Sequence, residues 1–144
     1  MFECIDRWID RLEGVYQPPR SADETLENTV QALLLNDADV RPRRIAVVST
    51  LHTGELPRIC ARLAERMSAH GHSACVEEAG GESCEFVFCP CGGILENSAL
   101  QAVLRTCDQA ILAETLKKSS LPRVRRVRSL LQDQNTDIVG VLLI

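Results

Sequence analysis

The sequence predicts an α/β domain of three layers, in which a mostly parallel five-stranded sheet has helices on both faces. Short apolar runs alternate along the chain with longer segments of helical periodicity. This alternation is typical of parallel strands joined by crossover helices. Within each run the apolar residues are consecutive and do not alternate with polar ones, as expected of strands that are buried on both faces.

The composition is that of one globular domain. Of the 144 residues, 45% are hydrophobic and 25% are charged, which is enough apolar material for one sizeable core. Aromatic residues make up only 3%, so that core must be built from aliphatic side chains. The formal net charge of −4 argues against a general nucleic-acid binder, because displacing the counterions of a phosphate backbone requires a basic face.

The first 20 residues are predicted to form an amphipathic helix and a stiff proline-containing connector, YQPPR, ahead of a single domain over residues 21–144. The helix has two possible packing sites. It packs either on its own sheet or on a second copy or a membrane partner, and the second case predicts a dimer at most. Its apolar stripe consists of Phe2, Ile5, Trp8, Ile9 and Leu12.

Local signals then give the elements of the domain in order. Ser21 and Glu24 form a capping box that begins a helix. Its predicted buried stripe is Leu26, Val30, Leu33 and Leu34. The later helices begin near proline or asparagine, and Gly71 is predicted to end the first of them. The segment 90–95 is predicted to be a loop. The predicted strands are 44–49, 72–78, 85–89, 109–113 and 138–143, and the predicted later helices are 57–69, 97–106 and 122–133.

The turn after the strand at 44–49 is the candidate site. In an open α/β sheet, the loop between a strand and the following helix presents N–H groups to an anion. This loop lacks the G-x-x-x-x-G-K-[ST] pattern of a phosphate-binding loop. His52 is placed where a ligand would approach, although a solvated loop histidine is the alternative. The degenerate loop consists of Thr50, Leu51, His52, Thr53, Gly54, Glu55, Leu56 and Pro57.

From residue 44 to residue 144 the order of elements resembles the P-loop ATPase domain of bacterial tyrosine kinases and related proteins of capsular and exopolysaccharide synthesis, which are similar to the MinD and ParA ATPases. The resemblance is clearest in CDQAILAE, in the basic helix after it, and in NTDIVGVLLI. It implies a P-loop NTPase-like fold with the strands in the spatial order 72–78, 85–89, 44–49, 109–113 and 138–143.

The same resemblance implies that the nucleotide-binding motifs are degenerate. Leu56 stands where the family has its phosphate-gripping lysine, and Pro57 stands where it has the magnesium-binding hydroxyl. Glu77 keeps one acid of the second acidic motif, while Pro90 and Cys91 occupy the Walker B position, where an aspartate is expected. Little is left to hold Mg²⁺ or to stabilise a transferring phosphoryl group. We therefore expect a pseudoenzyme with no cofactor, no metal and no catalytic residue.

Two further patterns each have two interpretations. The seven cysteines lie within strand-like and helix-like patterns, and Cys84, Cys89 and Cys91 lack a C-x-x-C spacing, so reduced structural thiols are favoured over a metal or redox site. KKSSLPRVRRVR, residues 117–128, is either a solvated helix face or a docking surface for an acidic partner or the inner membrane leaflet. Its candidate docking residues are Lys117, Lys118, Arg123, Arg125, Arg126 and Arg128.

The function that these patterns favour is a noncatalytic interaction or regulatory domain in bacterial capsular or exopolysaccharide synthesis. We expect it to be cytoplasmic, because the N-terminus lacks the apolar stretch of a signal peptide. The expected partner is a protein such as a membrane-bound chain-length regulator, which would hold the domain at the inner face of the membrane. Two alternatives stay open: a divergent nucleotide-binding kinase or ATPase, and a small-molecule-binding α/β domain unrelated to polysaccharide synthesis.

Overall fold

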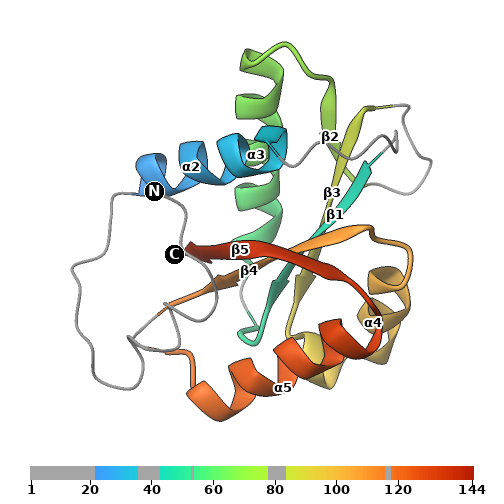
Figure 1. The fold of residues 1–144 in the computed structure, drawn as a ribbon. Helices are drawn as coiled ribbons and strands as arrows, with labels where there is room; N and C mark the ends of the chain where they lie inside the picture. The colour runs from blue at the N-terminus through green and yellow to red at the C-terminus, as the bar shows by residue number, and fades with distance from the viewer. Residues whose placement is uncertain (1–21, 36–42, 53, 78–83, 116–117) are drawn as a thin grey trace.

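The computed structural model describes residues 22–35, 43–52, 54–77, 84–115 and 118–144 (Figure 1). The predicted N-terminal helix, its connector and the cap at Ser21 lie outside the described residues, so their structure and the dimer expected from them remain predictions.

Five strands form one parallel sheet in the spatial order β2-β3-β1-β4-β5. This confirms the fold class and the strand order expected from the family resemblance. The strands are β1 Arg43–Ser49, β2 Ala74–Val76, β3 Phe86–Gly92, β4 Gln109–Glu114 and β5 Asp137–Leu143.

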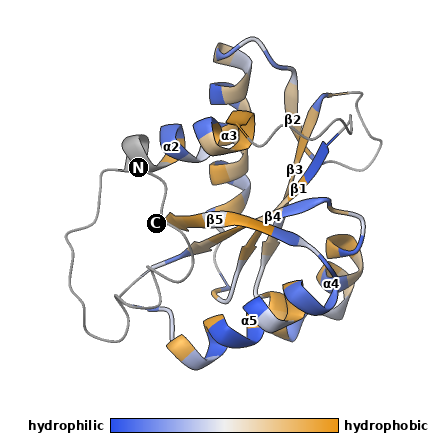
Figure 2. Ribbon diagram, viewed as in Figure 1, coloured by the Kyte–Doolittle hydropathy of each residue, from blue (hydrophilic) through white to orange (hydrophobic). Residues whose placement is uncertain are grey.

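Helices cover both faces of the sheet and complete the three layers (Figure 1). The helices α2 Ala22–Leu35 and α3 Leu56–Ala69 pack on one face. The 3₁₀ helix η1 Ile94–Glu96 and the helices α4 Ser98–Leu104 and α5 Leu121–Asp133 pack on the other. Alternating hydrophobic and hydrophilic residues along α5 show that it is amphipathic (Figure 2).

The predicted buried stripes are mostly confirmed. In α2, Leu26, Val30 and Leu33 are buried and Leu34 is half-buried. The inward residues of α3 and α5 are also buried, and they include Ile59, Cys60, Leu63, Met67, Val124, Val127 and Leu131. Gly71 follows α3 with a φ of 85°, a left-handed conformation that glycine adopts without strain. None of the described helices is long and apolar enough to cross a membrane.

The third strand is longer than predicted, because Pro90 does not end it. The segment 90–92 was predicted to be a loop, yet it continues β3 and pairs with β1, with Pro90 opposite Val47. The strand β2 pairs only with Phe86–Phe88, so beyond Phe88 this side of β3 is open as far as the described residues go. Alternation along β3 places the nitrogen of Pro90 on that open side, where a strand tolerates a residue without an N–H.

Two other elements are shorter than predicted. The second strand spans Ala74–Val76 and not 72–78. The helix predicted to run to residue 106 ends at Leu104. Its predicted cap is confirmed, since the Asn97 side chain accepts hydrogen bonds from the N–H groups of Ala99 and Leu100 at 3.1 and 3.3 Å.

Candidate functional site

The degenerate loop begins where β1, β3 and β4 end at the same edge of the sheet. Ser49, the last residue of β1, is opposite Gly92 of β3, and Glu114 ends β4 on the other side of β1. Parallel strands expose their carboxyl ends at one edge, and ligands of α/β proteins bind there. The structure therefore places the predicted loop at the position that a binding site requires.

Glu114 makes the main side-chain contacts at this edge, although it was not among the predicted site residues. Its side chain is fully buried. One carboxylate oxygen accepts a hydrogen bond from the Thr50 N–H at 2.5 Å, and the other accepts one from Thr50 Oγ1 at 2.8 Å. The Ser119 hydroxyl also donates to this carboxylate. In the sequence, Glu114 is marked only by its place directly after an apolar strand. That place does not reveal which residues the carboxylate will bind.

Burial raises the pKa of Glu114, because the charged carboxylate loses its hydration. Hydrogen bonds from Ser119 and Thr50 and the positive charge of Arg123 favour the charged form, and they reverse only part of the shift. The edge of the sheet therefore contains a buried acid whose three donors come from two different loops.

The start of the loop is held by further internal contacts. The Leu51 N–H donates to Ser49 Oγ at 3.0 Å, and the Gly93 N–H donates to the Leu51 carbonyl at 2.9 Å. Gly93 has a φ of 62°, and its missing Cβ makes room for the His52 ring, which would lie 2.4 Å from such an atom. The N–H groups of Thr50 and Leu51, which a phosphate loop would turn toward its ligand, thus have internal acceptors.

A charged chain on the surface connects this loop to α5. His52 Nε2 lies 3.3 Å from a carboxylate oxygen of Glu96. Arg123 forms an ion pair with Glu96 and donates to the Thr50 carbonyl at 3.2 Å. The Arg123 guanidinium lowers the pKa of Glu96. Arg123, a residue of the predicted docking face, therefore bonds to the loop from α5.

The first residues of α3 lack the groups that would grip a phosphate. Leu56, which was predicted to replace the lysine of a phosphate-binding loop, is buried in the core between α3 and the sheet. Pro57 has no N–H, so it removes one of the donors of this helix N-terminus. Glu55 occupies the N-cap position, at the positive end of the helix dipole, and its side chain makes no capping hydrogen bond. Thr53 lies outside the described residues.

Two pockets open beside the loop and share His52 and Gly54. The first has a volume of about 380 Å³. It is lined by His52, Gly54, Leu56, Pro57, Pro90 and Gly92. The second has a volume of about 630 Å³. It is lined by Leu51, His52, Gly54, Glu55, Thr115, Lys118 and Ile144. Both volumes are in the range of small-molecule sites.

Of the other predicted site residues, Pro90 lies beside the loop, whereas Glu77 and Cys91 line neither of these pockets. Glu77 forms an ion pair with Arg44, near the start of β1 and opposite the loop end of the strand. Pro90 lines the smaller pocket. Cys91 is fully buried in the layer below α5, and burial raises its pKa to about 12. No group of three or more metal-ligating side chains occurs in the part of the chain that the structure describes.

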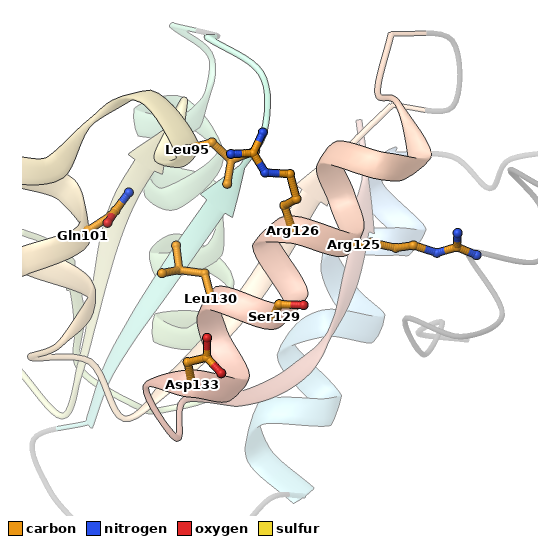
Figure 3. A pocket seen from close by; sticks show the side chains of 7 residues that line it. All are labelled: Leu95, Gln101, Arg125, Arg126, Ser129, Leu130 and Asp133. Atoms are coloured by element: carbon orange, nitrogen blue, oxygen red, sulfur yellow. The ribbon is translucent and has the colours of Figure 1, made fainter.

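The predicted docking face divides between two places. Lys118 lines the larger pocket at the sheet edge. Arg125 and Arg126 line a separate groove of about 420 Å³ beside α5, and Lys117 lies outside the described residues. In Figure 3, Arg126 extends toward Leu95 and Arg125 points away from it. The groove is lined by Leu95, Gln101, Arg125, Arg126, Ser129, Leu130 and Asp133.

No protein-family model matches the chain, and no curated protein matches it either. One solved structure that does match is the crystal structure of the chimerical protein CapA2B2, with a TM-score of 0.66. The chain shares that fold. The match covers 99% of this chain and 91% of CapA2B2, and the sequences are 10% identical. A likeness at this identity concerns the fold alone.

Proposed function

We propose that this chain is a noncatalytic P-loop-like domain that serves as an interaction or regulatory module in bacterial capsular or exopolysaccharide synthesis. The observation that carries the noncatalytic part is the contact between Glu114 and the loop. The buried carboxylate binds both the N–H and the hydroxyl of Thr50, at the position where the loop would begin to enclose a phosphate.

Electrostatics supports this part of the proposal. Two unit charges at 4 Å interact with about 4 kcal/mol at an effective dielectric constant near 20, so a buried carboxylate behind the loop opposes a polyphosphate in front of it. The positive groups that offset such repulsion in P-loop enzymes are a lysine and Mg²⁺. Here the lysine position is Leu56, which is buried in the core. The Arg123 guanidinium is paired with Glu96.

The link to polysaccharide synthesis rests on the resemblance of segments 107–114 and 135–144 to that family, and the fold shared with CapA2B2 agrees with it. For the partner, the groove beside α5 fits an acidic protein segment. Arg125 and Arg126 supply positive charge, and the half-buried Leu95 and Leu130 supply an apolar floor (Figure 3). We propose a membrane-bound chain-length regulator as this partner.

The two pockets at the sheet edge favour one competing function, a small-molecule-binding domain. Their volumes of about 380 and 630 Å³ are large enough for a metabolite. The gene neighbourhood separates the two proposals, because genes for capsule or exopolysaccharide export beside this one are expected only for the first.

Calorimetric titration with ATP and Mg²⁺ tests the noncatalytic proposal. We expect no binding tighter than about millimolar, since a helix N-terminus alone contributes roughly 0.3–1 kcal/mol toward an anion. Glu114→Gln is the matched variant, because it keeps the shape and removes the charge. A micromolar Kd for the wild-type chain would refute the proposal. Binding by Glu114→Gln alone would identify the carboxylate as the barrier.

A further inference from the structure

The groove beside α5 has opposite charges at its two ends. It lies between α5 on one side and η1 and α4 on the other, and its volume is about 420 Å³. Figure 3 shows Arg126 extending toward Leu95 at one end of the groove, Asp133 at the other end, and Leu130 between them. Arg126 and Asp133 are both exposed. The groove is therefore basic at one end, acidic at the other and partly apolar in the middle.

The residues that α5 presents in the middle and at the ends of this groove form one stripe along the helix. They are Arg126, Ser129, Leu130 and Asp133, which follow one another at the spacing of neighbours on one helix face. Arg126 and Asp133 are about 10.5 Å apart along the helix axis, which is too far for an ion pair between them. Within the part of the chain that the structure describes, neither forms an ion pair with any other side chain.

A second copy of α5, lying antiparallel to the first, complements this stripe in charge. A two-fold axis between Ser129 and Leu130 brings Arg126 of each copy opposite Asp133 of the other, so that two ion pairs form. The same axis brings the small side chain of Ser129 opposite Leu130, and burial of the half-buried Leu95 and Leu130 adds an apolar contribution. A partner that is acidic along its whole length would instead face Asp133 with a like charge.

We propose that the chain forms a two-fold homodimer through this groove, in which Arg126 of each copy pairs with Asp133 of the other. Such an interface is isologous, because the same residues act on both sides of the axis. The two helices then pack with their axes about 8–10 Å apart. The dimer goes beyond the proposed function and does not depend on it. Because the groove is the same one, a second copy and the acidic segment of the proposed partner compete for it.

Sedimentation equilibrium of the full chain over the micromolar concentration range tests the proposal. We expect a reversible monomer–dimer equilibrium. The mass of a monomer at every concentration would overturn the proposal. Because the chain is measured alone, that result would leave the proposed function standing, whereas calorimetry with ATP and Mg²⁺ tests the noncatalytic part separately.

Charge reversals identify the paired residues. Arg126→Asp places two acids opposite each other, Asp133→Arg places two arginines opposite each other, and each change should raise the dimer Kd by at least about tenfold. The double variant Arg126→Asp/Asp133→Arg restores both ion pairs with their direction reversed, so its Kd should return close to the wild-type value. Arg128→Asp is the matched control. It makes the same charge change on the same helix, at a residue that does not line the groove, and it should leave the Kd unchanged.

The variants also separate this dimer from one formed elsewhere. If the single reversals leave the wild-type Kd unchanged, another surface joins the copies and the proposal is wrong. If the single reversals weaken the dimer and the double variant does not recover it, the pairing of Arg126 with Asp133 is wrong. Circular dichroism checks that each variant is folded, as expected for changes at these two exposed side chains. A monomeric wild-type chain decides against the proposal even if a variant fails to fold.

Discussion

Replacing Glu114 with glutamine tests whether the buried acid destabilises the domain at neutral pH. Because burial raises the pKa of Glu114, the folded chain holds this proton more tightly than the unfolded chain does. The resulting stabilisation is complete below the ordinary pKa of 4.5 and is lost as the pH rises through the raised value. The glutamine variant has no such titration.

The magnitude follows from linkage. Between the ordinary and the raised pKa, the unfolding free energy of the wild type should fall relative to Glu114→Gln by up to about 1.4 kcal/mol per pH unit, and it should stay level above that window. The amide oxygen of glutamine still accepts from the Thr50 N–H. In Glu114→Ala the Thr50 N–H loses its acceptor, and Thr50 is only 2% exposed to solvent. This change should cost about 1–3 kcal/mol before any cavity term is added.

Urea unfolding followed by circular dichroism, from pH 4 to pH 8, measures all three chains. Other carboxylates cancel in the comparison, because the three chains share them. Parallel curves for wild type and Glu114→Gln would refute the raised pKa. A glutamine variant that becomes less stable than the wild type as the pH rises, by about 2 kcal/mol at pH 8, would instead show that the charged carboxylate is a net stabilising acceptor, in the range known for hydrogen bonds to charged groups.

Two further substitutions test the loop and its neighbour. Gly93→Ala should cost about 1–2 kcal/mol, because the residue has a left-handed φ of 62° and the new Cβ would displace the His52 ring. The nuclear magnetic resonance signals of His52 should shift with it, and an unchanged His52 would contradict this geometry. Asn97→Ala should cost about 1 kcal/mol, since the N–H groups of Ala99 and Leu100 lose their cap. Hydrogen exchange should then show α4 opening first, and equal protection in both chains would contradict the role of the cap.

The fold was predictable because its signals are local. Each strand is an apolar run, and each helix has a buried stripe that can be recognised without knowing its partner. The order of the strands needed the family resemblance, since periodicity does not say which strands are neighbours. The end of β3 was missed because a proline normally ends a strand. Pro90 is tolerated only because β2 has already ended beside it, and that fact belongs to the assembled sheet.

The place of the candidate site was predictable, but its contacts were not. A strand followed by a turn and a helix marks the edge where ligands bind, whatever the residues are. The group that occupies the loop comes from far along the chain, since Thr50 and Glu114 are 64 residues apart in sequence. The basic run was recognised as a possible docking face, yet the structure shows that Arg123 bonds to Glu96 and to the Thr50 carbonyl.

The internal carboxylate also explains how this loop keeps its shape without the groups that hold a nucleotide. Successive N–H groups at a strand end form a concave site that favours an anion. In a P-loop enzyme a phosphate supplies that anion, and a lysine and Mg²⁺ keep it there. Here Glu114 supplies negative charge from within the fold, and Ser49 and Ser119 complete the bonding. An anion that is covalently part of the chain thus completes the bonds at the start of this loop without a ligand.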